Sequence, residues 1–130
     1  PVPGWYAKGA SFSLLTEGTL NPNRKAALRV EFAPGGKIYN IGYSGVPVRE
    51  KEEYQLYFFA KTEASMTITA ALEAKDGAVL GKTEVKLQEG KEYRRYDCVL
   101  TAEGTDFEGR LSLSGDREGA VVFGFLSLMP

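Results

Sequence analysis

Apolar and polar residues alternate with a period of two along most of the chain, and no stretch keeps the period of an amphipathic helix. The clearest example is residues 66–74, in which four apolar side chains share one phase: Met66, Ile68, Ala70 and Leu72. The opposite phase holds Thr67, Thr69, Ala71 and Glu73. Because successive side chains of a strand point to opposite faces, this pattern predicts a strand with one packed face and one solvated face.

Turn residues divide the chain into about nine such segments. Asp76-Gly77 predicts a hairpin turn between residues 66–74 and 79–87, and Pro34-Gly35-Gly36 predicts another between 27–32 and 37–42. Further strands are predicted at residues 10–16, 53–62, 93–101, 107–114 and 120–128. This spacing of short strands favours an all-β domain, a two-sheet antiparallel β-sandwich of the jelly-roll type.

The size and charge of the chain are those expected of one domain. With 130 residues, 43% of them hydrophobic and 25% charged, the chain is expected to fold as a single unit over residues 1–130. The net charge of -1 comes from scattered groups and leaves no basic face, so neither nucleic acid nor a membrane surface is an expected partner. No apolar run is long enough to predict a membrane span. The start, Pro-Val-Pro-Gly, without methionine or signal peptide, predicts a module excised from a larger protein.

The chain contains no histidine, so the commonest general base and metal ligand is absent. This excludes Ser-His-Asp and Cys-His catalysis and most zinc sites. The carboxylates are scattered, without an evident pair of the kind that a glycosidase uses. Cys98 can form no internal disulfide, and its apolar neighbours predict a small buried side chain. No catalytic residue and no metal ligand are therefore predicted.

Aromatic residues are the chain's most distinctive resource, with seven tyrosines, seven phenylalanines and one tryptophan. Tyr54 shares the phase of Phe58 and is predicted to be buried. Tyr57 and Phe59 have the opposite phase, so they need either a ligand or a covering loop or domain. Exposed rings can pack on the C–H faces of sugars while polar neighbours bind the hydroxyl groups, which favours a carbohydrate as the ligand.

Several fragments, spread from end to end, resemble one known kind of module. They are Pro3-Gly4-Trp5, Leu20-Asn21-Pro22-Asn23 with Ala27-Leu28-Arg29-Val30, the turn 40–48, the strand 54–61 and the closing segment 122–130. In order and spacing they resemble the carbohydrate-binding-like module, of family 4/9 type, of the family 51 glycoside hydrolases, the α-L-arabinofuranosidases. Modules of that type are jelly-roll sandwiches.

The resemblance implies a noncatalytic module that targets plant cell-wall polysaccharide (arabinoxylan, arabinan, xylan or β-glucan) for a parent α-L-arabinofuranosidase. The implied partners are the polysaccharide or oligosaccharide and the catalytic domain of the parent chain, in a secreted or periplasmic location. The candidate carbohydrate-binding residues are Tyr39, Asn40, Tyr43, Tyr57 and Trp5. If the tyrosines stack on sugar, all three should share one concave surface.

Two positions depart from the family pattern. Ser44 stands where the turn usually carries tryptophan, which removes a large stacking surface, and Gly124 stands where an aspartate associated with structural calcium is common. Neither calcium nor another cofactor is therefore expected. The alternative to sugar binding is a structural sandwich that packs against the parent's catalytic domain and shapes it. That alternative requires an interdomain patch, formed by Tyr57, Phe59, Phe123 and Phe125.

Overall fold

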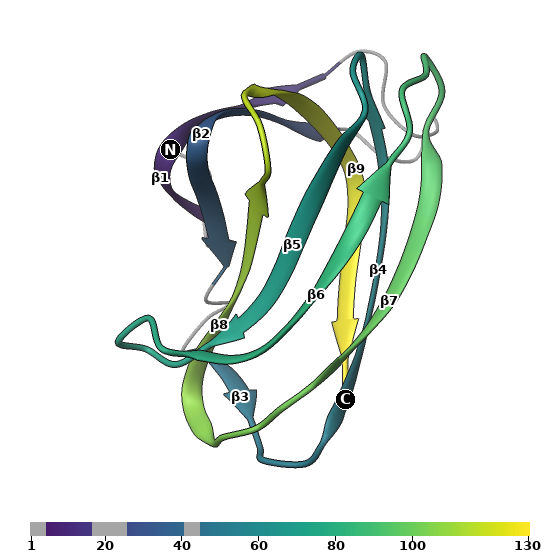
Figure 1. Cartoon of the computed structure of the whole chain (residues 1–130). Helices are drawn as coiled ribbons and strands as arrows, with labels where there is room; N and C mark the ends of the chain where they lie inside the picture. The colour runs from purple at the N-terminus through teal and green to yellow at the C-terminus, as the bar shows by residue number, and fades with distance from the viewer. Residues whose placement is uncertain (1–4, 17–25, 41–44) are drawn as a thin grey trace.

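The computed structural model describes residues 5–16, 26–40 and 45–130. Every regular element within these ranges is a β-strand, which confirms the all-β prediction (Figure 1). The strands are β1 (Trp5–Leu15), β2 (Ala27–Asn40), β3 (Val46–Val48), β4 (Glu53–Thr62), β5 (Met66–Glu73), β6 (Val79–Leu87), β7 (Arg94–Thr101), β8 (Asp106–Gly115) and β9 (Gly119–Met129).

The strands form two antiparallel layers that share β2. Their hydrogen-bonded order is β6-β5-β8-β2-β9-β4-β7, with β1 beside β2 and β3 beside β8. Residues 37–40 of β2 pair with β8, whereas residues 28–32 pair with β9. We name the layer of β6, β5, β8 and the end of β2 the β5/β8 layer, and the layer of β9, β4, β7 and the start of β2 the β4/β9 layer. The predicted sandwich is therefore confirmed, and β6 and β7 also contact each other at its open side.

The predicted hairpin turn at Pro34-Gly35-Gly36 is wrong, because β2 runs through it and crosses from one layer to the other. Strand β1 follows both halves of β2, with a register shift next to Gly9. Gly9 has a φ of 69°, and a side chain on Gly36 would collide with the carbonyl oxygen of Gly9. The glycines therefore allow two bent backbones to approach closely and do not reverse the chain.

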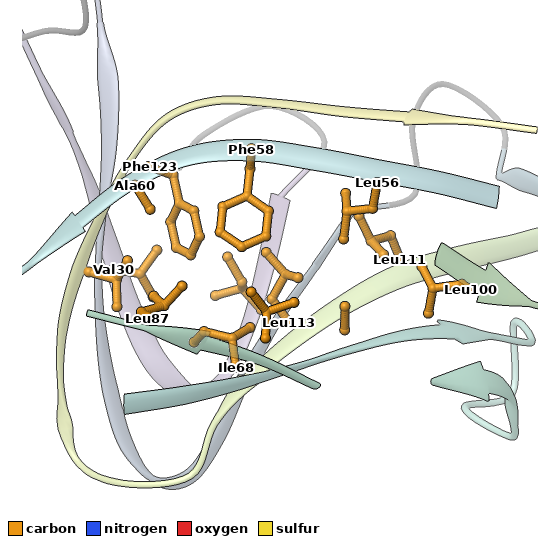
Figure 2. Close-up of a cluster of buried hydrophobic side chains, with 14 of the residues drawn as sticks. Val30, Leu56, Phe58, Ala60, Ile68, Leu87, Leu100, Leu111, Leu113 and Phe123 are labelled. Carbon is orange, nitrogen blue, oxygen red and sulfur yellow. The ribbon is translucent and has the colours of Figure 1, made fainter. Parts of the chain in front are cut away.

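The core lies between the two layers (Figure 2). Phe58 from β4 is fully buried, and its ring lies 5.6 Å from that of Phe123 and 5.5 Å from that of Tyr96. Burial of each such side chain contributes about 1.5–3 kcal/mol. The predicted inward positions are confirmed for Tyr54, Met66, Ile68, Ala70 and Leu72. Cys98 is half-buried and packs against this core.

A β-bulge in β9 corrects the position predicted for Phe123. Phe59 pairs with Phe125, but the next residue, Ala60, pairs with Phe123, so Gly124 is an extra residue that changes the phase of the strand. Phe123 therefore points into the core, with 5% of its surface exposed, whereas Phe125 points outward. The predicted patch of four aromatic residues loses this member.

Two further differences concern short segments. Residues 46–48 were expected to be a turn, yet they form β3, which pairs with β8 and buries Val48 completely. The outer face of β5 was expected to be solvated along its whole length, but Ala71 and Glu73 are buried. Glu73 is covered because cationic side chains from neighbouring strands lie over it, and these contacts lead to the candidate site.

Candidate functional site

The outer face of the β5/β8 layer carries a pair of stacked tyrosines. Tyr6 and Tyr39 are opposite each other in the β1–β2 register, and their rings lie 5.5 Å apart with an angle of 18°. From β8, on the other side of β2, the guanidinium of Arg110 lies 4.2 Å from the centre of the Tyr39 ring. Tyr39 is thus contacted from both sides, whereas Tyr6 is 47% exposed. Tyr6 therefore supplies the open aromatic surface, and Tyr39 supports it.

A buried carboxylate holds Arg110 in this position. Arg110 donates a hydrogen bond from Nε to Oε1 of Glu73 at 2.7 Å, and Lys37 donates from Nζ to Oε2 at 3.0 Å. The hydroxyl of Ser112 also donates to Oε2, at 2.9 Å. Burial alone would raise the pKa of Glu73, but the hydrogen bonds from Arg110, Lys37 and Ser112 stabilise the ionised form and lower the pKa overall. Glu73 is therefore an anion that fixes two cations.

Strand register explains why these distant residues meet. Glu73 lies opposite Arg110 in the β5–β8 pair, and Tyr39 lies opposite Ser112 in the β2–β8 pair. Residues two apart in a strand share a face, so Lys37 points to the same side as Tyr39. We name this surface the tyrosine–arginine face; its residues are Tyr6, Lys37, Tyr39, Glu73, Arg110 and Ser112.

Two predicted residues, Trp5 and Asn40, lie at the rim of the sandwich and not on this face. They are opposite each other in the β1–β2 register, one position before Tyr6 and one after Tyr39. Both line a cavity of about 510 Å³ together with apolar side chains such as Leu111. Trp5 is partly buried and packs against the core. Its ring therefore supports the fold more than it offers a surface for stacking.

Tyr57 lies on the opposite side of the molecule, on the outer face of the β4/β9 layer. Its ring is 6.4 Å from that of Phe59 and 5.7 Å from that of Phe125. The guanidinium of Arg95 lies 4.1 Å from the ring centre and is paired with Asp97 at 3.0 Å. The sequence analysis predicts that Tyr57 and Tyr39 share one surface, but the structure places them on opposite outer faces of the sandwich. Tyr43 lies outside the described residues.

These aromatic residues continue into an exposed apolar surface. Val99 and Met129 flank Gln55 in the register of the same layer, and they are 49% and 57% exposed. We name the group the phenylalanine patch; its residues are Tyr57, Phe59, Val99, Phe125 and Met129. Three of the four residues predicted for an interdomain patch therefore lie together.

Sequence reasoning missed Tyr6, Lys37, Arg110 and Glu73. Tyr6 was missed because β1 begins at Trp5, five residues before the predicted strand 10–16. The ion cluster could not be found from the local pattern, because its members come from three separate strands and a carboxylate in a strand normally indicates a solvated position.

Hydrogen bonds already engage the carboxylate at the centre of the tyrosine–arginine face. The Glu73 carboxylate is fully occupied by its three donors. Within residues 5–16, 26–40 and 45–130 no group of three or more acidic or cysteine side chains is placed to hold a metal ion. The same part of the chain contains no helix that could cross a membrane.

No protein-family model matches the chain. It is nevertheless similar in sequence to an extracellular exo-α-L-arabinofuranosidase of Streptomyces chartreusis, with 25% identity over 131 residues that cover 100% of this chain and 15% of that protein. α-L-Arabinofuranosidase 2 of Arabidopsis thaliana is 23% identical over 99 residues, which cover 74% of this chain and 15% of that protein. The chain thus spans about 15% of the length of these relatives.

Solved structures show the same fold. An arabinose-bound family 51 α-L-arabinofuranosidase superposes with a TM-score of 0.89 and 16% identity, over 98% of this chain and 23% of that one. A family 4 carbohydrate-binding module has a TM-score of 0.67 and 21% identity, over 96% of this chain and 93% of that one. A xylan-binding family 22 module of Paenibacillus barcinonensis has a TM-score of 0.70 and 12% identity, over 97% and 85%. The chain therefore has the fold of carbohydrate-binding modules and resembles, in sequence, a region of α-L-arabinofuranosidases.

Proposed function

We propose that this chain is a noncatalytic carbohydrate-binding module of an α-L-arabinofuranosidase, and that it holds plant cell-wall polysaccharide on the tyrosine–arginine face. The observation that carries the proposal is the half-exposed ring of Tyr6, supported from behind by Tyr39 and Arg110. A ring that is already ordered loses little conformational entropy when a sugar packs on it. The sequence similarity to α-L-arabinofuranosidases supports the nature of the parent enzyme.

Polar groups next to Tyr6 suit the hydroxyl groups of a sugar. Arg110 and Lys37 retain part of their surface, with side-chain exposures of 17% and 26%, although both are anchored to Glu73. Donors held in place in this way can hydrogen-bond a ligand without first being ordered. A shallow site of this kind buries little ligand, so the expected affinity is weak, on the order of micromolar to millimolar.

Affinity electrophoresis of the chain in gels that contain arabinoxylan, arabinan, xylan or β-glucan tests the proposal. At least one polymer should retard the protein, and Tyr6→Ala should weaken the retardation about 5- to 20-fold because the stacking surface is lost. Phe59→Ala is the matched control, since it removes an aromatic ring from the opposite face. Absence of retardation by all four polymers would refute sugar binding. Loss of retardation in Phe59→Ala but not in Tyr6→Ala would indicate that sugar binds the phenylalanine patch instead.

The proposed binding needs no metal ion, and the parent enzyme is proposed to be secreted. The metal requirement is tested by dialysis against EDTA, after which the retardation should be unchanged. The location is supported by the extracellular relative from Streptomyces chartreusis. Fractionation of the source cells, with the full-length protein found outside the cytoplasm, is the expected result.

The phenylalanine patch favours a second candidate function, a structural contact with the catalytic domain of the parent chain. Its exposed apolar side chains are typical of a surface that is covered in a larger assembly. On this interpretation Phe59→Ala would destabilise the parent enzyme and lower the melting temperature of the full-length protein. Retardation by polysaccharide would not change. The same melting temperature in the variant and the wild type would count against the structural role.

A further inference from the structure

Positive charge gathers around the exposed tyrosine. Lys8 and Lys37 are opposite each other in the β1–β2 register, on the face that also carries Tyr6 and Tyr39, and Arg110 lies beside them on β8. Within the described part of this surface the carboxylate that faces these three cations is Glu73. The whole chain has a net charge of -1, so this local excess of cations is a property of the surface.

Two carboxylates on nearby strands, those of Glu108 and Glu31, are paired with other cations. Glu108, which precedes Arg110 by two residues, lies 3.7 Å from Lys75. Glu31, the acidic residue of β2, is paired with Arg29 at 2.6 Å. Neither therefore compensates the cations around Tyr6.

Lys8 differs from the other two cations of this surface in its ion pairing. Glu73 is shared between Lys37 and Arg110, and Lys8 has no ion-pair partner among residues 5–16, 26–40 and 45–130. Like charges directly opposite in a strand pair are destabilising, so the Lys8–Lys37 pair brings a cost in the free protein. Lys8 is exposed and lies two residues from Tyr6 on the same face, about 6.5–7 Å along the strand.

We infer that the sugar chain bound on the tyrosine–arginine face carries a carboxylate, as a hexuronic acid does, and that Lys8 pairs with it. This inference rests on the proposed function and names the class of its ligand. The sugar ring packs on Tyr6 while the carboxylate accepts a hydrogen bond from the Lys8 ammonium, and Lys37 and Arg110 add a favourable field. One unpaired ammonium matches the single charge of a carboxylate better than it matches a densely sulfated polymer.

The experiment compares glucuronoxylan with the same polymer after its carboxyl groups have been reduced to hydroxyls. The chain should bind the native polymer about three- to fivefold more tightly at low salt, a range typical of one exposed ion pair, and this preference should disappear at 0.5 M NaCl. Lys8→Gln should abolish the preference, whereas Lys91→Gln, which removes an exposed lysine from the turn before β7, should keep it. Lys8→Gln should melt no earlier than the wild type, since it relieves the repulsion with Lys37.

The outcomes separate the inference from the function on which it rests. Equal binding of both polymers, or a preference for the native polymer that survives Lys8→Gln, would overturn the inferred pairing of Lys8 with a sugar carboxylate. Sugar binding itself would stand. Binding of neither polymer, nor of the four neutral ones, would refute both. Dextran sulfate that binds more tightly than glucuronoxylan, with the same affinity in Tyr6→Ala, would show general attraction of polyanions and would also overturn the inference.

Discussion

Replacing Glu73 with glutamine should destabilise the fold, because it removes the carboxylate that holds two cations of the tyrosine–arginine face. The Glu73 side chain is 5% exposed and lies 2.7 Å from Nε of Arg110 and 3.0 Å from Nζ of Lys37. Breaking a buried ion pair by removing one partner costs about 3–5 kcal/mol. Because Lys37 and Arg110 are partly exposed, water can solvate their charges in the variant and reduce this cost. We therefore expect a loss of about 2–3 kcal/mol in the free energy of unfolding.

The pH dependence of this loss is a second signature of the carboxylate. The pKa of Glu73 is lowered in the folded protein, so the ionised group stabilises the fold fully above the unfolded pKa of about 4.3. That contribution disappears as the pH falls through the lower, folded-state pKa. Since glutamine does not titrate, the difference between the wild type and Glu73→Gln should be largest near pH 7 and should shrink toward pH 2.

Urea unfolding followed by the fluorescence of Trp5, the single tryptophan of the chain, measures both effects. Glu84→Gln on β6 is the control, since Glu84 is exposed and its replacement should change stability by less than about 0.5 kcal/mol. The stabilising role of the Glu73 carboxylate is refuted if Glu73→Gln costs no more than Glu84→Gln at pH 7. It is also refuted if the loss is the same at pH 7 and pH 2.

Three further predictions test the fold. Gly36→Ala should cost about 1–3 kcal/mol because the new methyl group meets the backbone of Gly9. Gly90→Ala, which adds a methyl group in open space, should change the urea midpoint little. Equal midpoints for the two variants would contradict the close approach of Gly36 to Gly9. Phe58→Ala should cost about 3–5 kcal/mol in the same assay, and a loss below 1 kcal/mol would argue against the described core. Burial raises the pKa of Cys98 to about 11, so its reaction with a disulfide reagent should accelerate about tenfold per pH unit from pH 7 to 10; a plateau near pH 8.5, as for free cysteine, would contradict this.

The fold was largely predictable because its signals are local. The alternation in residues 66–74 and the Asp76-Gly77 turn correctly indicate β5, β6 and the hairpin between them. Two errors arose where a glycine acts through a distant strand. Gly36 permits the crossing of β2 because Gly9 of another strand is also bare, and Gly124 inserts a bulge whose effect is visible only in the pairing with β4. The local sequence pattern around Gly36 or Gly124 does not reveal which strand lies beside it.

The candidate site was less predictable, for a physical reason. Tyr39 was identified, but its exposed companion Tyr6 and its support Arg110 come from strands on either side of β2. Glu73 lies at an outward position of β5, where the pattern alone indicates solvent. Its burial results from side chains of two other strands that turn toward its charge, so it depends on the register of three strands together.

An NMR titration of the chain with arabinoxylo-oligosaccharides locates the contact surface residue by residue, so it shows whether the tyrosine–arginine face binds sugar. If sugar binds there, the largest changes in amide chemical shift fall on β1, β2 and β8 around Tyr6, Tyr39 and Arg110, and the tyrosine ring signals shift at the same ligand concentrations. Changes confined to β4 and β9 around Tyr57 and Phe125, or no changes at millimolar oligosaccharide, would contradict binding at this face.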